Sequence, residues 1–297
     1  MNHRAPRGRL DPEQLRTLVA SGEIETVVTV FPDLYGRLVG KRITGEYFVN
    51  DVLGHGMHAC DYLLACDMEM DPVPGYAFAS WADGYGDVHC VPDLATLRHA
   101  TWLERSAIVL CDVLNAETEA PVRVAPRSIL KAQVERARAA GYVAKMASEL
   151  EFFILRETYE SAQRKSFENL ETFGWYIEDY HTLQGLKSEP LVGAIRRHMD
   201  ASGIEVEFSK GEWGPGQTEI NLRYAEALEM ADRHVLYKQG CKEIALLQDL
   251  AVTFMAKFDE RYAGSSMHLH SSLWSAADDK PLFAGNPPAD GDLRGLP

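Results

Sequence analysis

Residues 149–155 place two glutamates in a segment that is otherwise fit for a protein core, Glu-Leu-Glu-Phe-Phe-Ile-Leu. In an extended strand, side chains two positions apart point to the same face, so Glu149 and Glu151 project together. Neighbouring carboxylates repel each other and are costly to desolvate unless a cation or several hydrogen-bond donors compensate them. The segment therefore predicts either a strand with one solvated face or a strand that carries two ligands of a bound cation.

Two further segments offer side chains of the same kind. Glu212 and Glu219 lie on either side of a Gly-Pro-Gly turn. Either the turn brings both carboxylates toward one point, or it is an ordinary turn with an acidic residue at each end. His268 and His270 are again two positions apart on an expected strand, where a histidine pair is either packed, exposed or a metal ligand. Taken together, four glutamates with one or two histidines suit Mg²⁺ or Mn²⁺ better than zinc, and such ions usually serve phosphates.

Helix and strand patterns predict an α+β protein with a domain boundary near residue 115, giving domains 1–114 and 115–297. In the first domain we expect a helix after Asp11, strands over 24–31, 38–43 and 107–114, and an ordered loop over 71–93 that buries its aromatic residues. In the second domain we expect helices over 127–140, 191–201 and 225–250, and strands over 142–155, 204–208, 219–224, 252–255 and 267–274.

Composition excludes several classes of protein. With 44 acidic and 30 basic residues the net charge is −14, which argues against a nucleic-acid partner. No apolar run reaches the ~20 residues that a membrane span needs, and the charged N-terminus is unlike a signal peptide, so we expect a cytoplasmic protein without a membrane partner. Five scattered cysteines favour reduced, mostly buried thiols over disulfides or a zinc site. P-loop, Rossmann and hydrolase-elbow motifs are absent from the sequence.

Several of these segments, in this order and spacing, resemble the glutamine synthetase family. In the catalytic domain of that family the matching segments are A-S-E-L-E-F-F, E-W-G-P-G-Q-T-E, Y-K-Q-G-C-K-E-I-A, and F-M-A-K before G-S-S-M-H-L-H. Residues 36–42, 84–87 and 92–93 resemble the family's N-terminal β-grasp domain. The resemblance covers nearly the whole chain and implies a β-grasp domain followed by a catalytic α/β domain that is incomplete at its C-terminus.

The resemblance implies a role for each matching residue. Glu151, Glu212 and Glu219 would hold one divalent ion, and Glu149 and His268 a second. The residues expected at ATP are Glu207, His270, Ser272 and, against the adenine ring, Tyr224; Glu207 as a surface strand residue and Tyr224 as a core aromatic remain open alternatives. The backbone at Gly264 would meet the substrate glutamate. No catalytic nucleophile is assigned.

The chemistry implied is the ATP-dependent joining of the γ-carboxylate of glutamate to an amine through γ-glutamyl phosphate, with two or more Mg²⁺ or Mn²⁺ ions. Ammonia-using members carry Asp-Gly-Ser-Ser and Asn-Gly-Ser-Gly segments, which are replaced here by an aromatic stretch (residues 60–81) and by Ala263-Gly-Ser-Ser266. These departures point to the branch similar to γ-glutamylpolyamine and γ-glutamylethanolamide synthetases, whose acceptor is a small organic amine or polyamine. A glutamine synthetase that uses ammonia and a non-catalytic relative that keeps metal and nucleotide binding are the alternatives. An unrelated metallohydrolase is disfavoured, since such enzymes usually place their histidine pair on an early strand.

The resemblance also implies a ring-shaped homo-oligomer with active sites between subunits. In the family, a further metal-binding glutamate, several arginines and an active-site flap follow the histidine-bearing strand, and this sequence stops at Pro297 before them. We therefore expect the 297-residue chain alone to be a weak or inactive catalyst.

Overall fold

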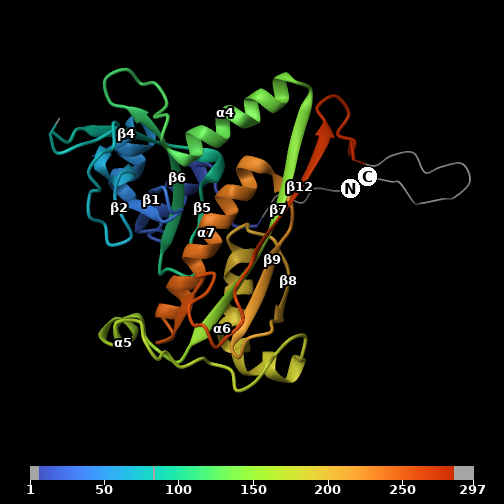
Figure 1. The fold of residues 1–297 in the computed structure, drawn as a ribbon. Coiled ribbons are helices and arrows are strands. Elements are labelled where there is room, and N and C mark those ends of the chain that lie inside the picture. The colour runs from blue at the N-terminus through green and yellow to red at the C-terminus, as the bar shows by residue number, and fades with distance from the viewer. Residues whose placement is uncertain (1–6, 83, 284–297) are drawn as a thin grey trace, which may run out of the picture.

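The computed structural model describes residues 7–82 and 84–283 and contains two sheets flanked by helices (Figure 1). The N-terminal sheet has the order β2-β1-β6-β4-β3, with β5 paired to β6. Strands β1 and β6 run parallel, and the other pairs are antiparallel. Its strands are β1 (Thr26–Pro32), β2 (Leu38–Thr44), β3 (Met57–Cys60), β4 (Asp87–Pro92), β5 (Arg98–His99) and β6 (Ser106–Asn115).

Short helices surround the N-terminal sheet. The first begins after Asp11, whose side chain accepts from the Gln14 amide while the Gln14 side chain accepts from the Asp11 amide, so two otherwise unpaired donors are satisfied. The helical segments are α1 (Pro12–Ala20), α2 (Gly45–Tyr47), η1 (Phe48–Val52), α3 (Leu53–His55), η2 (Asp61–Leu64) and η3 (Leu94–Thr96).

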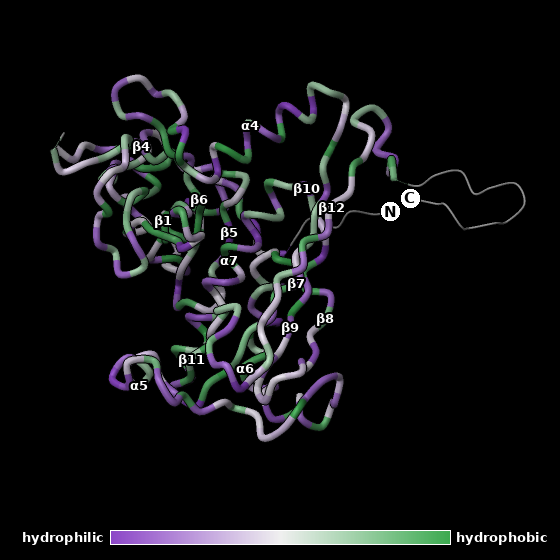
Figure 2. The backbone as a smooth tube through the Cα atoms, viewed as in Figure 1, coloured by the Kyte–Doolittle hydropathy of each residue, from purple (hydrophilic) through white to green (hydrophobic). Residues whose placement is uncertain are grey.

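The central strands of the N-terminal sheet, β1 and β6, are buried on both faces. Along β6, Val109 and Cys111 belong to a core shared with α1 and the helices after β2, whereas Ile108 and Leu110 belong to a second core. Strands β1 and β6 are accordingly largely hydrophobic along their length (Figure 2). This sheet therefore offers little room for a polar site.

The C-terminal sheet is built around the long strand β7. Strand β9 pairs with β7 on one side and β12 and β11 on the other, while β8 extends the sheet beyond β9. Its strands are β7 (Tyr142–Leu155), β8 (Val206–Gly211), β9 (Gln217–Leu222), β10 (Ala225–Glu226), β11 (Ala251–Thr253) and β12 (Met267–Ser275). The accompanying helices are α4 (Pro126–Ala139), α5 (Tyr159–Arg164), α6 (Thr182–Ala201) and α7 (Ala227–Leu246).

Helices α6 and α7 cover one face of the C-terminal sheet. Leu150, Phe152 and Ile220 point to that face and pack with Ile195 of α6 and Leu236 of α7. The same core also takes in residues of β1 and β6, so α7 lies between the two sheets (Figure 1). The opposite face of the C-terminal sheet carries the glutamates of β7.

A buried arginine joins the two sheets as well. The guanidinium of Arg127, on α4 and 4% exposed, donates to Asp232 of α7 at 2.9 and 3.0 Å, to Asp93 at 2.7 Å and to Asp112 of β6. Removing this cation would leave the buried Asp232 without its partner, while Asp93 and Asp112 would keep only Lys131.

Most of the expected elements are confirmed, with shifted boundaries. The expected helix over 191–201 begins at Thr182 instead, because Pro190 lies inside the helix and does not mark its start. Most of the loop expected over 71–93 is irregular, but its end forms β4. The expectation that its aromatic residues are buried is wrong for Tyr76 and Trp81, which are 40% and 85% exposed, and Phe78 and Tyr85 are only partly buried. Trp81 meets the Tyr85 ring in a T-shaped contact.

Two expectations from composition can be checked directly. Four of the five cysteines are buried, Cys60 is exposed, and all five are free thiols. Over residues 7–82 and 84–283, no helix has both the length and the apolar character that a bilayer crossing requires.

Candidate functional site

The register of the C-terminal sheet aligns polar residues from distant parts of the sequence on its open face. Glu151 of β7 lies opposite Glu219 of β9, which in turn lies opposite Lys210 of β8. One pair further along, Glu149 lies opposite both Asn221 of β9 and His268 of β12. Directly opposed residues share a face and their side chains are within contact distance. Two adjacent rows of ionisable and amide groups therefore cross the sheet.

The first acidic group consists of Glu151, Glu212 and Glu219. One carboxylate oxygen from each lies within 4.8 Å of the others, and Glu151 and Glu219 are only 8% and 4% exposed. Glu151 accepts hydrogen bonds of 3.0 Å from the Gln217 side chain and from the Ser266 backbone amide. Both donors bind the same oxygen of Glu151. The other oxygen of this carboxylate keeps its lone pairs for a cation.

The Gly-Pro-Gly turn brings Glu212 to this group, which is the first of the two alternatives left open by the sequence. Gly216 has φ = +79°, which favours glycine, and a Cβ at Gly214 would come within 2.2 Å of the Phe153 ring. The turn therefore needs both glycines to pack closely under the sheet. Glu212 lies just beyond β8, where its backbone amide donates to the Gln217 carbonyl.

The electrostatics of this group favour a bound cation. Burial raises the pKa of Glu219; Lys210 opposes this rise, and the carboxylates of Glu212, Glu149 and Glu151 add to it. A cation between these oxygens would relieve both the repulsion and the desolvation cost. The residues present thus fit a divalent ion held by oxygen ligands.

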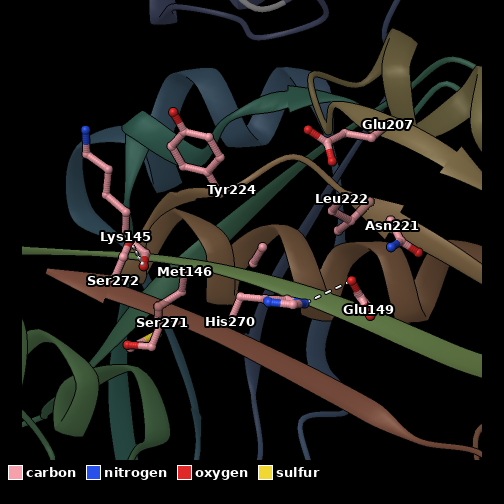
Figure 3. A pocket seen from close by; sticks show the side chains of 11 residues that line it. Lys145, Met146, Glu149, Glu207, Asn221, Leu222, Tyr224, His270, Ser271 and Ser272 are labelled. Carbon is pink, nitrogen blue, oxygen red and sulfur yellow. Dashed lines mark hydrogen bonds and ion pairs between the residues drawn. The ribbon is translucent and has the colours of Figure 1, made fainter. Parts of the chain in front are cut away.

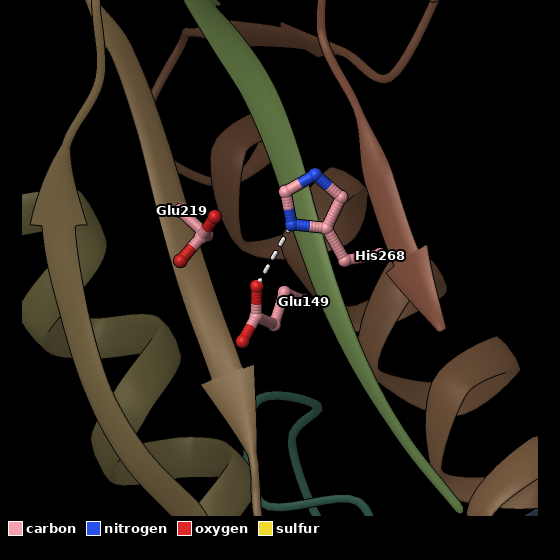
Figure 4. A group of neighbouring side chains, drawn as sticks. All are labelled: Glu149, Glu219 and His268. Carbon is pink, nitrogen blue, oxygen red and sulfur yellow. Dashed lines mark hydrogen bonds and ion pairs between the residues drawn. The ribbon is translucent and has the colours of Figure 1, made fainter. Parts of the chain in front are cut away.

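A second group, formed by Glu149, Glu219 and His268, shares Glu219 with the first (Figure 4). His268 Nδ1 lies 3.0 Å from one Glu149 oxygen and His270 Nε2 lies 2.9 Å from the other. The hydrogen bond with His268 lowers the pKa of Glu149 against the effect of burial, and His270 lowers it further. The same hydrogen bond raises the pKa of His268. Both histidines thus meet at one carboxylate, but only His268 joins a potential ligand group.

A cavity of about 340 Å³ opens beside Glu149 (Figure 3). All four residues expected at the nucleotide line it: Glu207, Tyr224, His270 and Ser272. Tyr224 is 50% exposed, which excludes its alternative interpretation as a core aromatic, and its ring stacks at 6.4 Å on Trp274. Glu207 is exposed and lies in a β-bulge between Val206 and Phe208.

Gly264, the residue expected at the substrate glutamate, lies in the loop before β12. Its carbonyl accepts a 2.9 Å hydrogen bond from the Gln217 side chain, which also donates to Glu151. A Cβ at Gly264 would lie 2.9 Å from the Ala256 carbonyl oxygen. The loop is thereby tied to the first acidic group through a single amide side chain.

Three polar residues of this face were not anticipated. Lys145 lines the 340 Å³ cavity, and its even spacing from Glu149 along β7 could have indicated a shared face. Asn221 lines the same cavity, is 4% exposed, and has a side-chain oxygen without a hydrogen-bond partner among the described residues. Lys210 donates a hydrogen bond to Glu212. The positions of Asn221 and Lys210 depend on strand register, which no local pattern reveals.

Comparison with known proteins gives consistent matches. Residues 123–291 match the family model described as glutamine synthetase, catalytic domain. The chain is 45% identical over 281 residues to the gamma-glutamylethanolamide synthetase GlnA4 of Streptomyces coelicolor, covering 95% of this chain and 60% of that protein. It is 34% identical over 280 residues to the glutamate–isopropylamine ligase of a Pseudomonas species, covering 94% and 60%.

A solved GmaS/ADP complex superimposes with a TM-score of 0.76 at 25% identity, over 92% of this chain and 58% of that one. The chain thus spans about 60% of the length of the curated relatives it matches. Its mixed α/β architecture, the matched catalytic region and the identities to both ligases lead to one conclusion. The chain belongs to the glutamine synthetase family.

Proposed function

We propose that this chain is part of an ATP- and divalent-cation-dependent ligase that joins the γ-carboxylate of glutamate to an amine. The observation that carries the proposal is the pair of ligand groups that share Glu219 on one sheet face, next to a cavity lined by Glu207, Tyr224, His270 and Ser272. Membership of a family whose matched relatives include a gamma-glutamylethanolamide synthetase and a glutamate–isopropylamine ligase supports it.

Each ligand group would hold one ion. Glu151, Glu212 and Glu219 would hold the first, and Glu149 and His268 the second, with Mg²⁺ or Mn²⁺ fitting these oxygen-rich groups. Such ions, when bound, neutralise charge on phosphate oxygens and so favour phosphoryl transfer. The chain itself supplies the position of these ligands: Gln217 and the Ser266 amide orient Glu151, and His270 holds the second oxygen of Glu149.

The nucleotide would occupy the 340 Å³ cavity. Tyr224, backed by Trp274, offers a flat aromatic surface for a purine ring. Glu207, His270 and Ser272 line the same cavity as hydrogen-bonding partners. The Lys145 ammonium lies 3.6 Å from the centre of the Trp274 ring and pairs with Asp279 at 2.6 Å.

The reaction would proceed in two transfers. The γ-carboxylate of glutamate, positioned by the backbone at Gly264, takes the terminal phosphoryl group of ATP and releases ADP. The nitrogen of a neutral amine then attacks the acyl carbon of γ-glutamyl phosphate, phosphate leaves, and a proton is lost from nitrogen. These steps need positioning and charge stabilisation and no side-chain nucleophile, which agrees with a site of carboxylates and histidines.

The proposed organisation follows the family resemblance. Residues 1–114 would form the β-grasp domain and residues 115–297 part of the catalytic domain, and the protein would assemble as a ring-shaped homo-oligomer in the cytoplasm. The end of β6 at Asn115 is compatible with the proposed boundary. One hydrophobic core nevertheless contains residues from both sides of this boundary, including residues of β6 and α7.

The acceptor would be a small organic amine or polyamine. Phosphate release by the protein expressed from its complete reading frame would be measured with glutamate, ATP and Mg²⁺, adding ammonium, ethanolamine, isopropylamine, putrescine or spermine in turn. We expect an organic amine to give the highest kcat/KM. Preference for ammonium would instead indicate a glutamine synthetase, and ATP binding without turnover with any acceptor would indicate a non-catalytic relative.

A further inference from the structure

Asn221, on β9, places a carboxamide between two of the carboxylates already described. Glu219 lies two residues earlier on the same face of the strand, and Glu149 lies directly opposite Asn221 on β7. Both carboxylates belong to the second ligand group, together with His268. Asn221 is therefore flanked by two members of that group, one along its own strand and one across the sheet.

The side chain of Asn221 lacks the partner that a buried amide normally has. The residue is 4% exposed, and its side-chain oxygen accepts no hydrogen bond from any of the described residues. A buried acceptor without a donor is costly, so such atoms generally meet a water, an ion or a ligand. Asn221 lines the 340 Å³ cavity together with Glu149. The unpaired oxygen thus belongs to the wall of a cavity and not to a closed core.

The position of Asn221 along this cavity favours a cation as the missing partner. In Figure 3, Asn221 and Glu149 lie at one end of the wall, whereas Tyr224 and Lys145 lie at the other. The proposed purine surface is therefore remote from Asn221. A phosphate oxygen cannot satisfy the amide oxygen, because both are acceptors. A cation, or a water bound to it, satisfies the amide oxygen and the neighbouring Glu149 carboxylate together.

The second ligand group also supplies few atoms for an ion of this kind. Its three members offer one atom each, and Glu219 is shared with the first group. Mg²⁺ and Mn²⁺ in oxygen-rich sites take about six ligands, so further protein or water oxygens are needed. A neutral amide oxygen adds a ligand without adding negative charge beside Glu149 and Glu219. An asparagine is therefore well suited to this place in the sheet.

We propose that the side-chain oxygen of Asn221 contributes to the site of the second ion, as a direct ligand or through a water on that ion. This inference rests on the proposed function and adds a residue to its metal site. The torsion about the Cβ–Cγ bond of asparagine has a broad range, so the carboxamide can turn its oxygen to the cavity without moving β9. In the metal-free protein this oxygen stays unpaired.

The test measures Mn²⁺ binding to the nucleotide-free protein, expressed from its complete reading frame, with free Mn²⁺ determined by electron paramagnetic resonance. We expect Asn221→Leu and Asn221→Ala to weaken the binding of one ion by about tenfold. Asn221→Asp, which keeps an oxygen at this place, should retain or strengthen it. Asn50→Leu makes the same chemical change at an exposed residue of η1 and should leave Mn²⁺ binding unchanged.

Double variants identify the ion that is affected. His268 belongs only to the second ligand group and Glu212 only to the first. Asn221→Leu should add little to the effect of His268→Ala, because both changes weaken the same site, but should add in full to the effect of Glu212→Gln. Full additivity with His268→Ala would overturn the inference.

Thermal unfolding provides a readout that does not depend on activity. Asn221→Leu removes an unpaired buried acceptor, so it should not lower the unfolding midpoint in the presence of a chelator. Mn²⁺ should raise the midpoint less in this variant than in the wild type. If Asn221→Leu does not fold, Asn221→Ala, which introduces no additional bulk, decides the question by the same measurements.

The outcomes separate the two proposals. Amine-dependent turnover in the wild type, with Mn²⁺ affinity unchanged in Asn221→Leu and Asn221→Ala, would overturn the inference and leave the ligase function standing. Weaker ADP binding with unchanged Mn²⁺ affinity would overturn it too and would assign Asn221 to the nucleotide. Loss of Mn²⁺ affinity in these variants without amine-dependent turnover in the wild type would contradict the ligase function alone. Absence of Mn²⁺ binding in the wild type would contradict both.

Discussion

Among the described residues the two sheets have six strands each, but they bury different side chains: β1 and β6 bury mostly apolar residues on both faces, whereas β9 buries apolar residues on one face and polar ones on the other. In β6, consecutive residues such as Val109 and Leu110 enter two different cores. In β9, Ile220 enters a core while its neighbour Glu219 lies with other carboxylates. Polar chemistry is therefore concentrated on the face of the C-terminal sheet opposite α6 and α7. The buried charges around Arg127 are instead paired with each other.

The largest effect should come from breaking the paired charges at the junction of the sheets. Arg127→Met leaves the buried Asp232 without a partner and Asp93 and Asp112 with Lys131 alone, and should lower the free energy of unfolding by about 3–5 kcal/mol. Urea denaturation followed by circular dichroism measures this loss. Arg123→Met, at an exposed position nearby, should change stability by less than about 0.5 kcal/mol. Equal effects would show that the Arg127 network is not the junction we describe.

Substitutions of two neighbouring residues on β9 should change the stability of the protein in opposite directions. Ile220→Ala removes a fully buried side chain and should cost about 2–5 kcal/mol of stability. Glu219→Gln should instead stabilise the metal-free protein at neutral pH, because burial and neighbouring carboxylates raise the pKa of Glu219 and its charged form is the unfavourable one. Thermal unfolding in the presence of a chelator compares the two variants. A loss of stability in Glu219→Gln would show that the charged form of buried Glu219 is not the unfavourable one.

The same Glu219 variant should weaken Mn²⁺ binding by at least about tenfold, because Glu219 belongs to both ligand groups. Titration calorimetry with Mn²⁺ measures the affinity. Glu205→Gln is a suitable control, since Glu205 lies just before β8 and pairs with Arg223 outside both groups. Similar affinities in the two variants would show that the open sheet face does not bind the ion.

The smallest effect concerns a histidine of the N-terminal sheet. Burial opposes the charge on His89, but the hydrogen bonds to Glu119 and to the His55 carbonyl raise its pKa above 6.5. Since the pKa in the folded state is above the unfolded value, the stabilisation is complete below about pH 6.5 and is lost as pH rises through the folded value. We expect the free energy of unfolding to fall by less than about 1 kcal/mol between pH 6 and pH 8.5. The variant His89→Gln should not show this fall when its unfolding is measured at the same two pH values. An identical pH dependence in the wild type and in His89→Gln would show that another titrating group causes the effect.

Sequence patterns predicted the parts of the site that depend on local periodicity. The spacing of Glu149 and Glu151 in a strand, and of His268 and His270 in another, is enough to place each pair on one face. The glycines of the 214–216 turn allowed Glu212 and Glu219 to approach each other but did not require it, and only the family resemblance implied that they share an ion. In these cases the decisive information lies within a few residues.

The rest of the site depends on information that local patterns do not contain. Lys210 and Asn221 join the site through the register of β8, β9 and β7, and a one-residue shift would place them on the other face. The start of α6 was predicted too late because proline usually marks a helix start, whereas packing against β8 and α7 supports this helix through Pro190. Tertiary contacts therefore decided what local preference could not.

The core that spans both sheets also has a consequence for synthesis on the ribosome. Val28, Val30, Ile108 and Leu110 belong to a core that includes residues of α7, so this core is incomplete until about 130 further residues, from Asn115 to Leu246, have been translated. At ordinary elongation rates this interval is roughly 7 to 26 s. During that time the nascent chain exposes an apolar surface that a chaperone would recognise, and pausing before α7 would prolong the period of risk.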